Sequence, residues 1–464
     1  MLELKTKEKL AEAARTLAQS YQMVYHNSTL FMPEHFLWGP TNLPLQDNER
    51  VYKALDRRDI QRIAARYQSI LFASESEMVS FEGMLKQLAV FDDQTPHGVL
   101  INVNNSLKVL KSDGTIEDPV GYFYPNYIST PVGRSSEDEK FVFDTIAEWT
   151  GGVEEANSIL RHLATALAPD WSAIKYVLLL GEGRNGKSVF LSMVMDLFGR
   201  ENISNVSRQN MSEKSPACID MNSRLLNIIM DGSAEYVKDS GLEKAVVAGE
   251  PAAVRKLYES TLTTVQTNGL FIEALNQEPK TRDKTPALQK RITRFYFENV
   301  YEENPAFMKQ MRSEEMLGAL LSLLIKNFVT QDSLGKALTP TQKSMSLRVD
   351  QMWLNSVVLQ WLEAALEKTP SIATKLVGAD VLPLVQAFIP WADSELNEHY
   401  TEADTLQMFK AVFNLRRSTR RNTTPRNYWK IVSVKYETQL LIDRVIAPTT
   451  TPTTTTIQGD QTDE

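Results

Sequence analysis

A glycine-rich loop between an apolar run and a helical segment constrains this chain more than any other feature of its sequence. The loop runs from Gly181 to Ser188 and fits the pattern Gly-x-x-x-x-Gly-Lys-Ser, directly after the apolar run 175–180. Such a loop presents backbone N–H groups to phosphate, and the helix predicted at 189–198 offers its positive end to the same anion. A chance match in a glycine turn is the alternative, but a strand before and a helix after favour nucleotide binding in an α/β layer.

The residue types within the loop predict separate roles in binding ATP and Mg²⁺. Lys187 would place a point charge on the β- and γ-phosphates, and the Ser188 hydroxyl would bind Mg²⁺. The other positions would surround the phosphates with backbone groups. With Lys187 and Ser188, the expected nucleotide site comprises Gly181, Gly183, Arg184, Asn185, Gly186 and Val189.

Two downstream runs that read as strands end in polar residues and supply further catalytic candidates. The run 225–230 is followed by Asp231, which would bind Mg²⁺ and polarise the attacking water, unless it merely begins an Asp-Gly turn. Glu235 is the nearest further carboxylate and could serve as the base. The run 269–275 is followed by Asn276, whose amide could hold the lytic water, although asparagine commonly ends strands.

Basic residues flank a further apolar strand. Lys290 and Arg291 precede it, and Arg294 lies within it. An arginine that reaches the γ-phosphate bound by a neighbouring subunit would stabilise transition-state charge. A solvated basic edge is the alternative.

Length and composition indicate a globular protein of several domains. A chain of 464 residues exceeds what one hydrophobic core usually supports, so two to four domains are expected. The net charge of -8 means that any nucleic-acid contact must come from local basic patches. The single cysteine, Cys218, excludes an intrachain disulfide and suits a reducing compartment. We find no signal peptide and no apolar run long enough to span a bilayer, so a cytoplasmic protein without membrane contact is expected.

Basic residues gather in two places that could contact DNA. Lys244, Arg255 and Lys256 surround a Gly-Glu-Pro turn, and such cations would follow a single strand without reading its sequence. Between positions 410 and 444, nine basic side chains stand against two acidic ones, with aromatic residues interleaved. The alternative for the first cluster is an ordinary exposed loop. The alternative for the second is a solvated basic face or a surface that binds an acidic partner. The candidates for phosphate contact in the second stretch are Arg416, Arg417, Arg420 and Arg421.

The order of these elements resembles the superfamily 3 helicases, specifically the phage and plasmid primase-helicase family that includes the poxvirus primase-helicase. The similarity covers residues 95–345 and rests on the phosphate loop, the strand before Asp231, the segment 242–258, Asn276-Gln-Glu-Pro and Lys290-Arg291. Two departures stand out. The family's second acidic residue is missing, because Gly232 follows Asp231, and lysine replaces the first of its paired arginines. The segment ahead of the loop shows no Asp-x-Asp pair set on strands, so we expect it to lack the primase module of the family.

The resemblance implies a P-loop AAA+-type ATPase core that uses ATP and Mg²⁺ to drive a replicative ring helicase, expected to be a hexamer. Arg291 would complete the Lys187 site of a neighbouring subunit, and the segment 242–258 would grip single-stranded or forked DNA in the channel. Travel would be 3′ to 5′, and a separate primase or polymerase is a possible partner. An ATPase that remodels or loads a protein complex at a fork is the alternative function, and a small-molecule kinase is a third.

Periodicity along the chain predicts the domain organisation. Helical spacing covers 4–25, 50–72 and 75–90, and short strands follow from 98, with a turn at Asp113-Gly114. The expected parts are an N-terminal α+β domain (1–134), a helical collar (135–170), the motor (171–330), a mainly helical, winged-helix-like C-terminal domain (331–448) and a disordered Thr-rich tail (449–464).

Overall fold

The chain divides into two compact units, Met1–Ser344 and Met345–Glu464, and each is described by itself. The boundaries expected from sequence within these units stay predictions. The computed structural model describes residues 2–26, 29–33, 51–91, 98–119, 123–133, 135–168, 176–211, 215–233, 241–255, 262–278, 291–328, 338–354, 356–396, 398–418 and 428–446. The predicted Thr-rich tail lies outside these residues.

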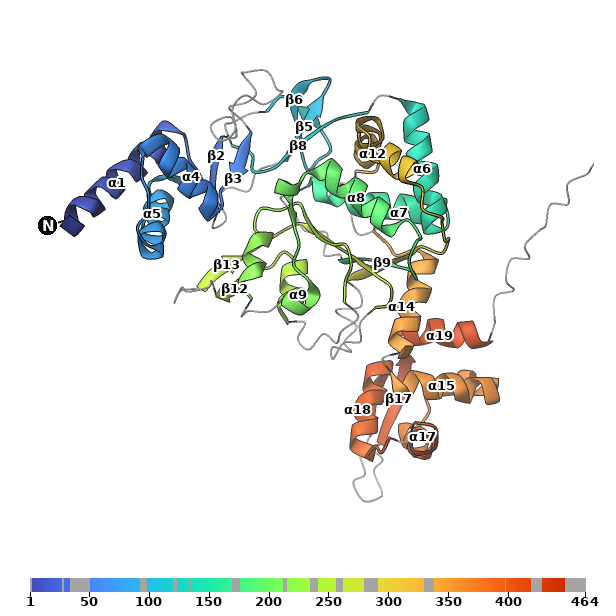
Figure 1. Cartoon of the computed structure of the whole chain (residues 1–464). Helices are drawn as coiled ribbons and strands as arrows, with labels where there is room; N and C mark the ends of the chain where they lie inside the picture. Colours follow the sequence, from blue (N-terminus) through green and yellow to red (C-terminus); the bar gives the residue numbers. More distant parts are fainter. Residues whose placement is uncertain are drawn as a thin grey trace, which may run out of the picture. The chain divides into compact units, whose positions relative to one another are not determined.

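A five-stranded parallel sheet forms the core of unit 1 (Figure 1, green to yellow). The strands β9, β11 and β14 are buried at every position, as expected of parallel strands that are covered on both faces. All three strands predicted ahead of Gly181, Asp231 and Asn276 are therefore confirmed. The spatial order is β10 (Ile203–Ser204), β11 (Leu226–Ile229), β14 (Leu270–Leu275), β9 (Tyr176–Leu180) and β15 (Ile292–Tyr296).

The connections of this sheet diverge around β9. The chain leaves β9 through helix α8 (Lys187–Phe198) and reaches β10 at one edge, whereas after β14 it passes β9 to form β15 at the other edge. In open parallel sheets, ligands bind at the carboxyl ends of the strands where connections diverge. The topology therefore directs attention to the ends of β9 and β14.

Alternate side chains of the central strands pack on opposite faces, because successive residues of a strand point to opposite sides. On one face, Leu179 and Ala274 join the core built by four helices. These helices are α6 (Ser136–Thr150), α7 (Val153–Ala164), α8 and α12 (Glu314–Lys326). The segment 135–170 is divided at Gly151, which ends α6 in a left-handed conformation with φ 86°.

The other face of the sheet is covered by a short helix and a hairpin. Leu178 and Leu275 pack in a core with Val246 and Val254. These belong to α9 (Gly241–Val247) and to the antiparallel pair β12 (Ala252–Arg255) and β13 (Leu262–Val265). The whole insertion lies in the chain between β11 and β14.

A second, four-stranded sheet precedes the collar helices. Its order is β7 (Ile116–Glu117), β6 (Ser106–Leu110), β5 (Val99–Val103) and β8 (Tyr127–Pro131). Asn104 and Asn105 connect β5 to β6 with φ values of 56° and 62°, which is the two-residue turn that suits a twisted hairpin. The predicted turn at Asp113-Gly114 is confirmed by the hydrogen bond from the Gly114 N–H to the Lys111 carbonyl.

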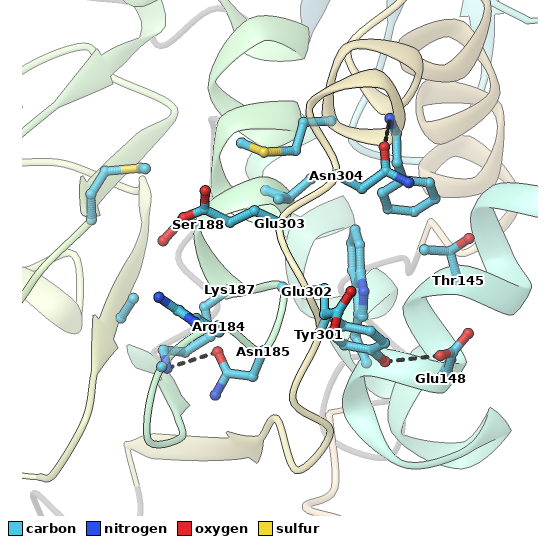
Figure 2. A pocket seen from close by; sticks show the side chains of 18 of the residues that line it. Thr145, Glu148, Arg184, Asn185, Lys187, Ser188, Tyr301, Glu302, Glu303 and Asn304 are labelled. Carbon is cyan, nitrogen blue, oxygen red and sulfur yellow. Dashed lines mark hydrogen bonds between the residues drawn. The ribbon is translucent and has the colours of Figure 1, made fainter.

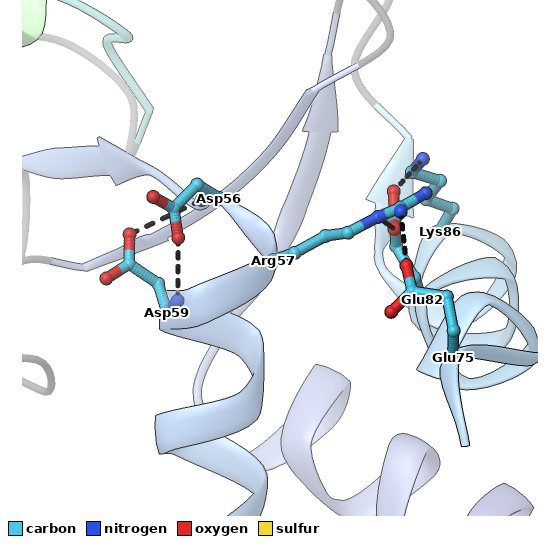
Figure 3. Close-up of polar contacts among 6 residues, drawn as sticks. All are labelled: Asp56, Arg57, Asp59, Glu75, Glu82 and Lys86. Atoms are coloured by element: carbon cyan, nitrogen blue, oxygen red, sulfur yellow. Dashed lines mark hydrogen bonds and ion pairs between the residues drawn. The ribbon is translucent and has the colours of Figure 1, made fainter. Parts of the chain in front are cut away.

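The N-terminal helices are confirmed, but their ends differ from prediction. The elements are α1 (Leu2–Ser20), β1 (Val24–His26), β2 (Thr29–Pro33), β3 (Tyr52–Ala54), α4 (Arg57–Gln68), α5 (Glu75–Leu88) and β4 (Val90–Phe91). The helix expected from residue 50 begins only at Arg57, because Asp56 caps it and the preceding residues form β3. Figure 3 shows Arg57 joining α4 to α5 through Glu75 and Glu82, at 2.7 and 3.0 Å.

Unit 2 contains helices around one two-stranded antiparallel sheet. Aromatic side chains fill its core, including Trp361, Phe388 and Phe409. The elements are α15 (Val357–Lys368), α16 (Ala373–Leu376), α17 (Val381–Glu395), α18 (Glu402–Val412), β16 (Phe413–Ser418), β17 (Tyr428–Val434) and α19 (Tyr436–Ile446). Among the described residues, the remaining α-helices are α11 (Pro305–Met311) and α14 (Gln342–Leu354). Among the described residues, no helix has the length and hydrophobicity that a membrane span requires.

Candidate functional site

The carboxyl ends of three neighbouring strands open onto one cavity of about 860 Å³. Gly181 follows β9, Asp231 lies just beyond β11, and Asn276 follows β14. Asp231, Asn276 and the loop residues Gly183 to Val189 line the cavity. Figure 2 labels Arg184, Asn185, Lys187 and Ser188 of the loop. The structure thus brings together the residues predicted to bind phosphate, metal and water, although their catalytic roles stay predictions.

Left-handed backbone shapes the loop. Gly186 has φ 90°, and a Cβ atom there would lie 2.8 Å from the indole nitrogen of Trp149. Gly181 has φ 147°, and a Cβ there would collide with the side chain of Asn185. The Phe190 N–H donates to the Gly186 carbonyl at 2.9 Å, so α8 begins directly at the loop. This path leaves backbone N–H groups at the N-terminal end of a helix, as an anion requires.

The ammonium group of Lys187 lies at the base of the loop and is only 6% exposed. It donates to the Gly181 carbonyl at 2.5 Å and to Asn185 Oδ1 at 3.0 Å. Burial lowers the pKa of Lys187, and the charge of Asp231 opposes that shift. Among the described residues no carboxylate forms an ion pair with it. A buried cation with two neutral acceptors fits a site for an anion, because an unpaired buried charge is costly.

Asn185 ties the loop to the neighbouring strand. Its Nδ2 donates to the carbonyl of Phe297 at 3.0 Å, just beyond β15. The same side chain accepts from Lys187, so one buried amide orients the cation and anchors the loop. The Arg184 carbonyl accepts from the Tyr301 N–H at 2.7 Å, which adds a second anchor.

The far wall of the cavity has a different chemistry. Figure 2 shows Lys187 and Asn185 on one side, with Tyr301 and Glu148 toward the other. Tyr301 donates to Glu148 Oε1 at 3.0 Å, and burial raises the pKa of the phenol. Side chains from α6 and α11 also line the cavity: Phe141, Phe307 and Met308, with Trp149 packed against Gly186 of the loop. The segment before α11 adds the polar residues Glu302, Glu303 and Asn304. A phosphate-binding end beside an apolar, partly polar wall suits a nucleotide rather than a bare phosphate.

Glu235, the predicted base, lies outside the described residues, and its role stays a prediction. The structure also shows a buried carboxyl that sequence reasoning missed. Glu273 lies within β14, and burial raises its pKa to about 7, although Arg208 and a hydrogen bond from Tyr176 act against the shift. Its side chain packs on the face of α9 and does not line the cavity. A glutamate inside an otherwise apolar strand was the available signal.

The raised pKa of Glu273 predicts a pH-dependent stability. The folded protein holds a proton that the unfolded chain, with an ordinary pKa of 4.5, releases, so stability should fall as pH rises from about 4.5 to 7. Glu273→Gln removes this loss. We expect the variant to gain about 2–3 kcal/mol relative to wild type between pH 5 and pH 8, measured by thermal unfolding. Tyr176, Arg208, Glu243 and Glu278 are the charged or titratable neighbours. A pH-independent difference between the two proteins would contradict the assignment.

The two described arginines beside β15 have different surroundings. Arg294 is fully buried and binds Glu278 through two contacts, at 2.6 and 2.8 Å. Arg291 is half-buried, and its Nη1 donates to the Lys244 carbonyl on α9 at 2.9 Å. Arg294 is thus held by an ion pair within its own subunit. Arg291 stays the candidate for contact with the γ-phosphate bound by a neighbouring subunit. Lys290 lies outside the described residues.

The residues predicted to bind DNA fall on the insertion and on unit 2. Lys244 is half-buried on α9, Arg255 is exposed at the end of β12, and Lys256 lies outside the described residues. In unit 2, Arg416 is exposed on β16 and pairs in register with Lys430.

The rest of the basic stretch in unit 2 is described only in part. The backbone of Arg417 pairs with that of Trp429, whereas Arg420 and Arg421 lie outside the described residues. Three of the nine cations are engaged within the unit: Lys410 stacks over the Trp429 ring at 4.5 Å, Lys430 lies 4.0 Å from Asp380, and Lys435 donates to the Lys410 carbonyl at 2.8 Å.

The residues present fit a magnesium nucleotide. Among the described residues, no group of three or more His, Cys, Asp or Glu side chains could hold a metal ion alone. Mg²⁺ normally takes one or two protein oxygens and completes its shell with water and substrate phosphates. The exposed Ser188 hydroxyl and Asp231 carboxylate at the cavity are such a pair.

Comparison with known proteins gives only distant structural likeness. The sequence matches no protein-family model and no curated protein. An A-form apo structure of the NrS-1 C-terminal region has a TM-score of 0.49 and 11% identity, covering 91% of this chain and 98% of that chain. A second apo structure of that region has a TM-score of 0.44 and 12% identity, covering 92% of this chain and 99% of that chain.

Proposed function

We propose that this chain is the ATP-hydrolysing motor of a replicative DNA helicase from a phage or mobile element. The observation that carries the ATPase half is the buried Lys187 ammonium, which has no carboxylate partner among the described residues and lies at a cavity shared by three strand ends. Lys187 and the loop amides bind the phosphates, and Ser188 with Asp231 hold Mg²⁺. Bound Mg²⁺ neutralises charge that develops on the transferred phosphoryl group.

The remaining residues of the cavity have roles that follow from their positions. Asn276 orients the attacking water beside Asp231, since both open onto the same space. Trp149 and Phe307 shelter the nucleoside, because apolar and aromatic walls exclude water from a bound ligand. The nucleotide therefore binds with its phosphates at the loop and its nucleoside against the aromatic side chains.

The insertion between β11 and β14 supports action on DNA. Its β12–β13 hairpin carries the exposed Arg255 and follows α9, which carries Lys244. In the superfamily 3 helicases that this sequence resembles, the corresponding segment projects into a channel and grips DNA. This hairpin lies between β11, which precedes Asp231, and β14, which precedes Asn276. A change at either residue on nucleotide binding can therefore move the hairpin.

The motor works as a ring, expected to be a hexamer, in which Arg291 reaches the γ-phosphate of the adjacent subunit. Its hydrogen bond to the Lys244 carbonyl is then exchanged for the phosphate contact. By resemblance the ring travels 3′ to 5′ on one strand, in the cytoplasm of a bacterial host, beside a separate primase or polymerase.

A forked-duplex assay tests this function. Purified protein is incubated with a labelled fork and ATP, with ADP as the matched control. We expect strand separation with ATP alone. ATP hydrolysis without strand separation on forks of either polarity would reject the helicase, and would favour an ATPase that remodels or loads a protein complex at the fork.

Charge reversal on the hairpin should weaken DNA binding. Arg255→Glu is expected to lower affinity for single-stranded DNA several-fold and to reduce the slope of log affinity against log salt by about 1. The measurement is fluorescence anisotropy over a salt series. Arg15→Glu, an exposed reversal on α1, is the control and should leave both quantities unchanged. An identical salt slope for Arg255→Glu and wild type would remove Arg255 from the DNA contact.

A further inference from the structure

Four buried polar side chains connect four elements beneath the nucleotide site. Tyr176 on β9 donates to Glu273 Oε2 on β14 at 3.0 Å. The Arg208 guanidinium lies 5.5 Å from the centre of the Tyr176 ring. Arg208 Nε also binds Glu243 Oε1 on α9 at 2.9 Å, with side-chain exposures of 1% and 0%. The chain of contacts therefore runs from β14 to α9 without reaching solvent.

One end of this chain touches the turn that carries the expected magnesium ligand. Gly232, which follows Asp231, donates its N–H to the Ala274 carbonyl at 2.8 Å. A Cβ atom on Gly232 would collide with Glu273 Oε1, so the backbone of the turn lies against that carboxyl oxygen. Any displacement of the Asp231–Gly232 turn must therefore displace Glu273.

The other end reaches the DNA-binding insertion. Glu243 precedes Lys244, whose carbonyl accepts from Arg291 at 2.9 Å. Helix α9 leads through Gly249 into β12, and Val246 packs with Val254 in one core. A shift of α9 is therefore transmitted both to the hairpin and to Arg291, the arginine expected to reach the phosphate of a neighbouring subunit.

Stability alone is a poor explanation for this arrangement. A buried Arg–Glu pair commonly adds little to stability over an apolar pair of the same volume. Glu273 Oε1 and Arg208 Nη1 also lack hydrogen-bond partners among the described residues, which is costly for buried groups. The unused acceptor and the unused donor belong to the two residues that contact Tyr176. They leave the network with the capacity for a second set of bonds, as a two-state coupling element requires.

We propose that Glu273, Tyr176, Arg208 and Glu243 form a positioning relay that couples the nucleotide site to the β12–β13 hairpin. Movement of the Asp231–Gly232 turn shifts Glu273, the Tyr176 hydroxyl follows, and the Arg208–Glu243 pair repositions α9. DNA on the hairpin acts back on the turn by the same route, because coupling between two binding sites is reciprocal. The relay rests on the proposed helicase function.

The test replaces Tyr176 with phenylalanine, which removes the hydroxyl and keeps the ring under Arg208. ATP hydrolysis is measured with and without single-stranded DNA. We expect the rate without DNA to stay within about twofold of wild type, and the stimulation by DNA to fall about fivefold or more. The ratio of DNA affinities with and without a non-hydrolysable ATP analogue should shrink by a similar factor.

Two further variants separate coupling from damage to the fold. Tyr52→Phe, in the buried part of the N-terminal sheet, is the matched control and should keep full stimulation. Glu243→Gln should reduce stimulation, and the double variant Tyr176→Phe/Glu243→Gln should lose no more than the worse single variant, since both lie in one route. Full stimulation in Tyr176→Phe, or additive losses in the double variant, would overturn the relay alone. A wild-type protein whose hydrolysis ignores DNA would overturn the proposed function, and the relay with it.

Discussion

Lys187→Ala is expected to lower ATP hydrolysis by at least about 100-fold and to abolish strand separation. The ammonium lies at the base of the loop and lines the cavity. Under the proposed function, negative charge accumulates there as the γ-phosphate is transferred. Alanine removes this charge and also releases Asn185, which accepts from Lys187 while anchoring the loop to Phe297. Phosphate release under saturating ATP and forked-duplex unwinding are the two measurements.

The fold should survive that substitution. Lys187 has no carboxylate partner among the described residues, so its removal takes away a desolvated charge, and the thermal midpoint of Lys187→Ala should not fall. Lys309→Ala, an exposed lysine on α11 near the same cavity, is the control and should retain wild-type hydrolysis. Equal hydrolysis and unwinding by Lys187→Ala and wild type would end the motor hypothesis.

The gathering of Asp231 and Asn276 at the loop could be predicted because parallel strands place their carboxyl ends at one edge. Each residue follows an apolar run of strand length, and each lines the cavity that Lys187 also lines. No knowledge of strand order was needed for this inference. The order itself, with β14 between β9 and β11, depends on crossover connections that periodicity does not encode.

Contacts between residues far apart in sequence were beyond prediction. Tyr176 and Glu273 are 97 positions apart, and Arg208 and Glu243 are 35 apart. Glu273 stands out in its apolar strand, but its partners do not follow from that. The pairing of β9 with β14 brings Tyr176 to Glu273, and the packing of α9 brings Glu243 to Arg208. The apolar part of the cavity was missed for the same reason, because Phe141 and Phe307 come from helices that lie 166 positions apart in the sequence.

Sequence periodicity also failed to predict very short strands, which form only because they pair with a neighbouring strand. A helix was expected from residue 50, but residues 52–54 form the strand β3, which pairs with β2. Three residues carry too little periodicity to distinguish a strand from a helix. The capping box formed by Asp56 and Asp59 marked the true start, and this pair was the overlooked signal.

The two described arginines beside β15 illustrate how structure separates candidates that sequence treats alike. Arg294 is 0% exposed and forms a two-contact pair with Glu278, whereas Arg291 is half-buried and binds one backbone carbonyl. Loss of Arg294 would leave the carboxylate of Glu278 buried without its partner. Loss of Arg291 would release a single hydrogen bond.

Arg294→Met is therefore expected to destabilise the protein by about 3–5 kcal/mol, which corresponds to a fall of roughly 10 °C in thermal midpoint. Arg291→Met, the matched substitution three positions away, should leave the midpoint nearly unchanged and should instead lower hydrolysis in the assembled ring. The double variant Arg294→Met/Glu278→Leu should recover most of the lost stability, because it removes the buried carboxylate of Glu278 together with the arginine that neutralises it. If Arg294→Met kept the wild-type midpoint and lost hydrolysis, Arg294 would replace Arg291 as the residue that reaches the neighbouring phosphate.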